Sequence, residues 1–206
     1  ARPPYRRARM YRQKALDPKR GRLAPTKLAH VVRRTSRFAE MIRWHEVVFG
    51  AYPVYKDDTI AFLTYDDEHH RFAIANIPGL PDQPELAAGT DHVAFTHDSL
   101  GDLLYTYERL KGEGIVPYWC INHGMTTSMY YKDPDGNRVE FQADNFPSVE
   151  EGNAWIRNSD FAANPIGVIF EPEDLLARFK AGEPLEKLVI RPALPEGKSP
   201  FDMLRL

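Results

Sequence analysis

One arrangement of segments occurs twice in this chain, and it constrains the fold more than any other feature. Each copy reads as a short apolar strand, an amphipathic helix and three further strand-like runs separated by acidic turns. The copies span about 27–80 and 90–146, and the proline-rich stretch between them is typical of a linker. The order of the elements, more than sequence identity, relates the two copies. It predicts an α+β protein built from two βαβββ modules.

The segments outside this double repeat have a different character. Residues 1–22 form a basic N-terminal arm, and 23–146 form the domain that holds both repeats. From 147 to 206 we expect a C-terminal extension with short helices at 148–160 and 171–188. No motif in this extension can be attached to chemistry.

Charge is distributed unevenly along the chain. The arm carries nine of the 27 Lys and Arg residues but only one of the 29 Asp and Glu residues, which leaves 18 basic and 28 acidic residues after position 22. Such an arm is typical of nucleic-acid binding, which would make retention on DNA salt-sensitive. The alternative, which we favour, is that it docks on the acidic body of its own or a neighbouring subunit. Nothing further along the chain resembles a nucleic-acid reader, so we expect no nucleic-acid partner.

Three residues are candidate metal ligands. His30 and His92 stand in the first strand of their respective copies, and Glu140 lies in the last strand of the second copy, between two apolar neighbours. Alternation along that strand directs Glu140 away from the face of Val139 and Phe141. A buried carboxylate there is costly without a cation, and two imidazoles with one carboxylate are a ligand set of non-haem Fe(II) proteins. Taken singly, each residue has an ordinary explanation as a structural histidine or a solvent-facing glutamate.

The sequences around these residues resemble a known superfamily. "AHVV", "DHVAF" and "YYKDPDGNRVEFQ" are similar to the vicinal-oxygen-chelate proteins, which include glyoxalases, fosfomycin- and bleomycin-resistance proteins and type I extradiol dioxygenases. The resemblance implies a curved, partly open, barrel-like mixed sheet around a metal site. It also implies Fe(II), with Mn(II) as the alternative, on His30, His92 and Glu140. No glutamate lies between His69 and Pro84, where glyoxalase-type members often have a fourth ligand.

The resemblance to extradiol dioxygenases also suggests catalytic residues. "DDEHHRFAIA" is similar to the stretch that carries their acid–base histidine, which corresponds to His70. Tyr130 corresponds to the tyrosine that hydrogen-bonds the substrate, and His123 to a further pocket histidine, although His123 lies closer to Tyr130 than is usual. The alternatives are a solvated polar turn at His70 and an ordinary strand aromatic at Tyr130. By composition alone, pocket walls are expected from Tyr118, Trp119, Ile121 and Phe146.

These observations together predict an Fe(II)-dependent extradiol dioxygenase. It would open a catechol-type aromatic diol with O2, in a protein that we expect to be a homo-oligomer. The alternatives are a metal-dependent lyase or transferase of the glyoxalase or fosfomycin-resistance type, or a non-catalytic ligand-binding protein. The single cysteine excludes an intrachain disulfide, and no apolar run approaches the roughly 20 residues that span a bilayer. We therefore expect a cytoplasmic protein without a membrane partner.

Overall fold

A computed structural model of the protein describes residues 24–84 and 87–205. The chain divides into two compact units, one up to Pro81 and one from Asp82 onward. The basic arm predicted at 1–22 lies outside the described residues. No helix in the described ranges is both long and apolar enough to cross a membrane.

The first unit contains one βαβββ module. Its elements are β1 (Val31–Thr35), α1 (Phe38–Phe49), β2 (Tyr52–Lys56), β3 (Ile60–Thr64) and β4 (Phe72–Asn76). The sheet has the order β1-β4-β3-β2, with β1 and β4 parallel and the other pairs antiparallel. The helix α1 ends at Gly50, whose φ of 61° is readily adopted only by glycine. Because β1 pairs with β4, the first and last strands of the module are neighbours and run in the same direction. Residues just before each of these strands therefore lie close together.

The second unit repeats this topology. It contains β5 (His92–His97), α2 (Leu100–Gly112), β6 (Trp119–Asn122), β7 (Thr126–Lys132) and β8 (Arg138–Asp144). Again the first and last strands, β5 and β8, run parallel at one side of the sheet. The structure confirms the predicted α+β class and the two βαβββ modules. In the described residues each module forms a mixed sheet of its own, and neither sheet closes into a barrel.

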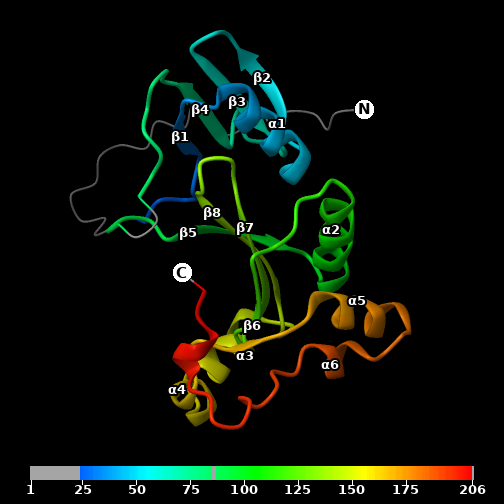
Figure 1. Cartoon of the computed structure of the whole chain (residues 1–206). Coiled ribbons are helices and arrows are strands. Elements are labelled where there is room, and N and C mark those ends of the chain that lie inside the picture. The colour runs from blue at the N-terminus through cyan, green and yellow to red at the C-terminus, as the bar shows by residue number, and fades with distance from the viewer. Residues whose placement is uncertain (1–23, 85–86, 206) are drawn as a thin grey trace, which may run out of the picture. The chain divides into compact units, whose positions relative to one another are not determined.

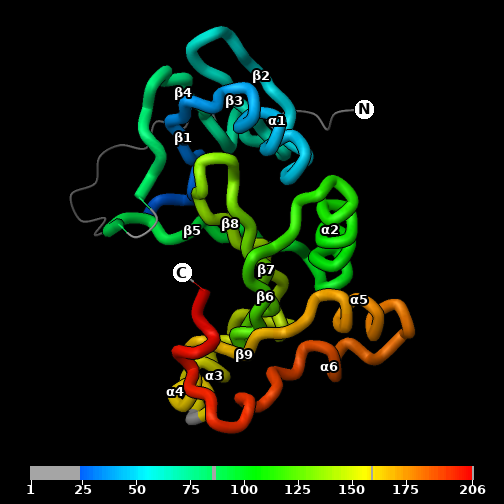
Figure 2. Tube along the Cα trace, viewed as in Figure 1, coloured from blue at the N-terminus to red at the C-terminus, as the bar shows by residue number. Residues whose placement is uncertain are grey.

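The predicted C-terminal extension is part of the second unit. It contains α3 (Val149–Ile156), α4 (Ser159–Ala163), β9 (Val168–Ile169), α5 (Pro172–Lys180), α6 (Leu185–Leu188) and a final 3₁₀ helix (Pro200–Met203). Figure 2 follows this path from yellow to red. The two residues of β9 pair antiparallel with β6 and extend the sheet to the order β5-β8-β7-β6-β9. The extension is thus joined to the second module through its sheet.

The two faces of the second sheet have different partners. Val139 and Phe141 of β8 are 3% exposed, and Tyr131, the cross-strand partner of Val139, is 1% exposed. The helix α2 contacts β5 and β8 and packs on the sheet (Figure 1). Tyr131, Val139 and Phe141 are buried on one face of the sheet, and the contacts of α2 with β8 assign this face to the helix. Alternation then directs Tyr130 and Glu140 to the opposite face, as predicted for Glu140.

Candidate functional site

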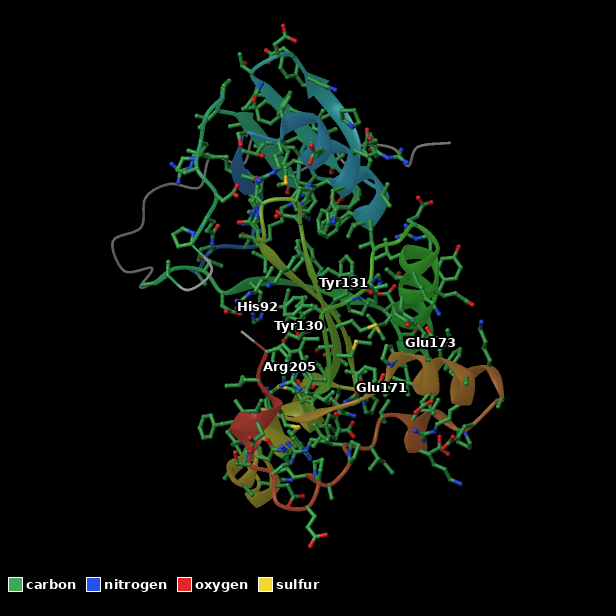
Figure 3. The ribbon with its side chains drawn as sticks, in the orientation of Figure 1. His92, Tyr130, Tyr131, Glu171, Glu173 and Arg205 are labelled. Atoms are coloured by element: carbon green, nitrogen blue, oxygen red, sulfur yellow. The ribbon has the colours of Figure 1, made fainter. Side chains whose placement is uncertain are left out.

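The second unit contains a cavity of about 430 Å³ on the face that carries Glu140. Strands β5, β7 and β8 form one side, and α3 of the extension forms the other. Four polar side chains line it close together: His92, His123, Tyr130 and Glu140. Figure 3 labels His92 and Tyr130, which lie near each other on neighbouring parts of the sheet. This cavity is the candidate active site.

Glu140 and His92 meet inside the cavity. They come from parallel neighbouring strands and from positions of the same face, since Ala94 is the register partner of Glu140. The Nε2 atom of His92 lies 3.0 Å from Oε2 of Glu140, and the glutamate is only 5% exposed. The hydrogen bond with Glu140 raises the pKa of His92 to about 9. Burial disfavours ionisation of Glu140, but hydrogen bonds from His92 and Ser128 outweigh it and lower the pKa of this carboxyl.

The outer side of the His92 ring is also held. Asp91 accepts a hydrogen bond from Nδ1 of His92 at 2.7 Å, and Arg138 donates to the other oxygen of Asp91 at 2.7 Å. A carboxylate on Nδ1 is the usual support for a metal-binding histidine, because it leaves Nε2 to face the ion. A buried carboxylate oxygen beside such an imidazole nitrogen is a donor pair that suits a divalent cation. These two residues therefore fit the expected metal.

The third predicted ligand, His30, belongs to the first unit. Neither unit, over its described residues, brings together three or more His, Cys, Asp or Glu side chains that could hold a metal ion. His30 directly precedes β1, and its exposed ring lies 4.4 Å from the ring of His70 between centroids. The parallel pairing of β1 with β4 explains this approach, since each histidine stands just before one of these strands.

His70 and its neighbour His69 differ in their surroundings. His70 is half-buried against Phe62, at 4.7 Å between ring centroids, whereas His69 is exposed. Burial, followed by the nearby His30 and His69, lowers the pKa of His70. Strand alternation does not separate these two histidines, because β4 begins only at Phe72. Their rings lie 4.5 Å apart between centroids.

Tyr130 occupies the strand position opposite Glu140. It is the register partner of Glu140, is 2% exposed, and meets the His92 ring edge-on at 5.2 Å between centroids. Burial and the nearby charge of Glu140 raise the pKa of Tyr130, so its hydroxyl keeps its proton at neutral pH. That hydroxyl lies 3.0 Å from Nε2 of His123. The two predicted residues Tyr130 and His123 therefore form a hydrogen-bonded pair in the cavity.

His123 follows the end of β6 and lies mostly buried. Its Nε2 is 3.9 Å from Oε1 of Glu140, and its Nδ1 is bonded to the backbone carbonyl of Ile166 in the extension. Burial lowers the pKa of His123. The ring is thus held between the cavity on one side and the extension on the other.

The aromatic residues predicted as pocket walls take two different places. Phe146 lines the cavity. Trp119 stacks on Tyr130 at 4.5 Å between centroids, and Tyr118 and Ile121 pack in the same cluster, outside the cavity lining. The extension supplies a wall that the sequence did not indicate, through Val149, Gly152, Asn153 and Ile156 of α3. The only signal for this wall is the Ser148 cap followed by an amphipathic helix, a pattern with no chemical signature.

Comparisons with known proteins agree on one family. The model of the Glyoxalase/Bleomycin resistance protein/Dioxygenase superfamily matches residues 27–141. Biphenyl-2,3-diol 1,2-dioxygenase 2 of Rhodococcus globerulus is 45% identical over 166 residues, which cover 80% of this chain and 87% of that protein. Biphenyl-2,3-diol 1,2-dioxygenase 3 of the same organism is 42% identical over 167 residues, covering 80% and 88%.

Solved structures share the fold at low identity. A glyoxylase/bleomycin resistance protein/dioxygenase domain from Frankia sp. EAN1pec matches with a TM-score of 0.50 and 18% identity, over 59% of this chain and 99% of that one. Its likeness concerns the fold alone. The family model and the two relatives confirm the superfamily predicted from the sequence motifs. This chain belongs to the Glyoxalase/Bleomycin resistance protein/Dioxygenase superfamily.

Proposed function

We propose that this protein opens the ring of a biphenyl-type aromatic diol with O2. The predicted enzyme class, an extradiol dioxygenase, is confirmed by the two biphenyl-2,3-diol 1,2-dioxygenases that match most of the chain. The observation in the molecule that best supports the proposal is the approach of His92 Nε2 to the buried carboxylate of Glu140. An imidazole nitrogen beside a buried carboxylate oxygen is a pair of ligands that suits a divalent cation, which a purely ligand-binding relative does not require.

The proposed metal is Fe(II), held by His92 and Glu140 together with His30 of the first module. Mn(II) suits the same donor types. His30 is included on the strength of its place in the first repeat and of the family resemblance. When bound, such an ion supplies a Lewis-acidic, redox-active centre for the two diol oxygens and O2.

The remaining residues position the substrate and move protons. Tyr130, protonated at neutral pH, hydrogen-bonds a substrate oxygen, and its partner His123 holds the direction of that hydroxyl. Asp91 fixes the ring of His92. His70 is the proposed acid–base residue, since imidazole exchanges protons near neutral pH. Phe146 and the apolar residues of α3 line the side of the cavity that would receive the aromatic rings.

An oxygen electrode combined with visible spectroscopy tests this proposal. The protein is loaded anaerobically with Fe(II) and mixed with air-saturated biphenyl-2,3-diol. We expect one O2 consumed per diol and a yellow ring-opened product. No O2 uptake with a panel of diols, despite one tightly bound metal, would instead support a lyase or transferase.

Glu140→Gln tests the metal assignment within the same experiment. The neutral amide is a weak ligand, so we expect loss of stoichiometric metal and of O2 uptake while the far-UV circular dichroism is unchanged. Glu150→Gln, which removes an exposed carboxylate outside the cavity lining, serves as the matched control and should retain both. A Glu140→Gln protein that keeps one tightly bound metal would exclude Glu140 as a ligand.

A further inference from the structure

The turn that carries His123 is held by the C-terminal extension. Asn122, at the end of β6, is 4% exposed, and its side-chain amide donates to the Val189 carbonyl at 3.0 Å. Gly124 lies under the ring of Trp155, so close that a Cβ there would stand 1.9 Å from the indole. Residues on both sides of His123 are thus in contact with segments that follow the double repeat.

A second turn in the extension contacts His123 directly, and Asn164 organises it. The side-chain oxygen of Asn164 accepts from the backbone N–H groups of Ile166 at 3.2 Å and Gly167 at 2.8 Å. Its amide donates to the Gly167 carbonyl at 2.9 Å, and the residue is only 5% exposed. One buried side chain therefore satisfies three backbone groups of the turn 164–167.

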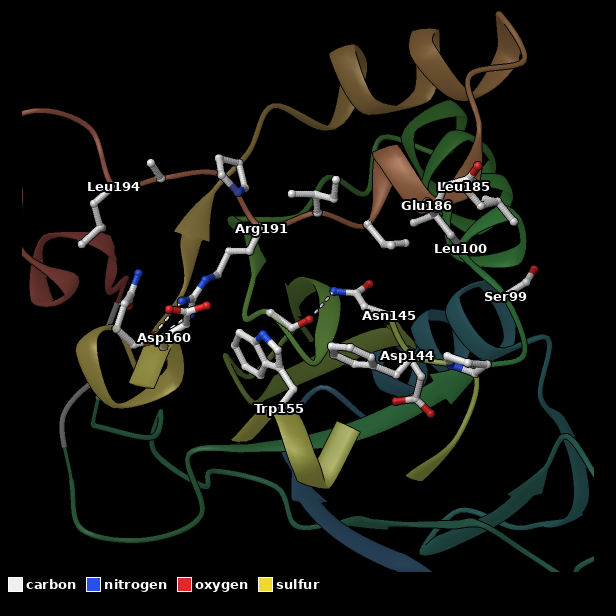
Figure 4. A pocket seen from close by; sticks show the side chains of 18 of the residues that line it. Ser99, Leu100, Asp144, Asn145, Trp155, Asp160, Leu185, Glu186, Arg191 and Leu194 are labelled. Carbon is white, nitrogen blue, oxygen red and sulfur yellow. Dashed lines mark hydrogen bonds between the residues drawn. The ribbon is translucent and has the colours of Figure 1, made fainter. Parts of the chain in front are cut away.

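Arg191 supports this turn from the other side. Its guanidinium donates to the Asn164 carbonyl at 2.7 Å and to the Asp160 carbonyl at 2.9 Å. It also lies over the Trp155 ring at 4.9 Å, and Figure 4 shows these side chains together at the wall of a larger open groove. Hydrogen bonds therefore fix both the side chain of Asn164 and its backbone carbonyl.

The turn is seated directly on the end of β6. Gly167 has a φ of +121°, and a Cβ there would stand 2.5 Å from the Asn122 carbonyl oxygen. Only glycine permits this approach. The close seating presents the Ile166 carbonyl to Nδ1 of His123.

This contact determines which nitrogen of His123 carries the proton. A backbone carbonyl can only accept, so Nδ1 must be the donor. In the neutral ring Nε2 is then bare, so it is an acceptor 3.0 Å from the Tyr130 hydroxyl, whose other neighbouring acceptor is the Glu140 carboxylate. The Tyr130 oxygen in turn has its lone pairs available to a hydroxyl that donates from the cavity, as the hydroxyls of a diol can.

We propose that Asn164 is a positioning residue, which holds His123 as the Nδ1–H tautomer through the turn 164–167. The tautomer makes Nε2 of His123 an acceptor that competes with Glu140 for the Tyr130 proton, and it leaves the tyrosine oxygen as an acceptor for the substrate. The tautomer follows from the contacts alone, whereas its effect on turnover rests on the proposed dioxygenase function.

Nitrogen-15 NMR of the histidine rings in the metal-free full-length protein tests the tautomer without any assay of activity. The His123 signals are assigned by their loss in His123→Gln. We expect Nδ1–H in the wild-type protein. Asn164→Leu, similar in size but unable to accept, should shift His123 toward Nε2–H. Asn158→Ala removes the cap of α4 in the same extension and should leave His123 unchanged.

The same variants loaded with Fe(II) give the second readout. We expect kcat of Asn164→Leu to fall at least about tenfold with KM changed less than about twofold, because orientation is lost and the cavity is not. Asn158→Ala should stay close to wild type. An Nε2–H ring in the wild-type protein overturns the proposal without any variant, and so does an unchanged Nδ1–H ring in Asn164→Leu. The expected tautomers in a protein without dioxygenase activity would contradict the proposed function and leave the role of Asn164 in the tautomer intact.

Discussion

At the scale of single residues, His70 and its hydrogen-bonded neighbour His69 allow a test of acid–base chemistry. Only His70 is half-buried and in ring contact with His30. We expect His70→Ala to retain metal but to lose about a hundredfold in turnover, the usual contribution of a general acid or base. His69→Ala should stay within about threefold of wild type. O2 uptake and bound-metal analysis measure both, and an unchanged turnover in His70→Ala would remove His70 from the mechanism.

The sequence predicts some site residues well because their placement depends on short-range rules. Glu140 stands between two apolar strand residues, so alternation alone assigns its face. The contact between His123 and Ile166 could not be anticipated, because the residues are 43 positions apart and one of them contributes only its backbone carbonyl. Every residue has the same backbone carbonyl, so a contact through it leaves no trace in the sequence.

At the scale of elements, the turn 164–167 should be unusually sensitive to substitution. Gly167→Ala adds a Cβ that meets backbone atoms of Asn122, at a φ that L residues rarely adopt. We expect it to lower the free energy of unfolding by about 3 kcal/mol, and Gly182→Ala by about 1 kcal/mol. Gly182 also has a positive φ, of +78°, but open space around its Cβ position, so it isolates the backbone strain. Urea denaturation measures both, and equal losses would show that the close seating on β6 contributes nothing.

The predicted elements agree with the structure where a periodic pattern is long enough to read. Both module helices and the short helices at 148–160 and 171–188 are present, the latter two each divided into two helices. The strand β9 has only two residues and was not predicted. Two residues cannot display a period of two, so pairing with β6 decides their conformation.

At the scale of the whole molecule, His45 gives stability a pH dependence that can be separated from that of the candidate site. This histidine of α1 is 2% exposed, and burial lowers its pKa to about 4, with a smaller effect from Arg33. Below its ordinary pKa of about 6.5, the unfolded chain binds a proton that the folded protein excludes. Stability should therefore fall as the pH drops from 6.5 to about 4, by about 3 kcal/mol for this residue.

His45→Phe isolates this contribution. The ring packs against Phe49 and Phe72, and phenylalanine keeps that packing without a titrating group. Urea denaturation at several pH values should give a shallower decline for the variant between pH 6.5 and 4. Parallel curves for the two proteins would show that folding does not lower the pKa of His45.

The seating of the turn 164–167 on His123 also has a consequence for protein synthesis. Translation proceeds from the N-terminus, and domains generally begin to fold in that order. The candidate ligands His92 and Glu140 therefore leave the ribosome before the Ile166 carbonyl and the ring of Trp155 that hold the turn of His123. A nascent chain thus contains the candidate metal ligands before it contains the groups that orient His123. A chain that ends early, before Trp155, would have these ligands but would lack the groups that hold His123 in place.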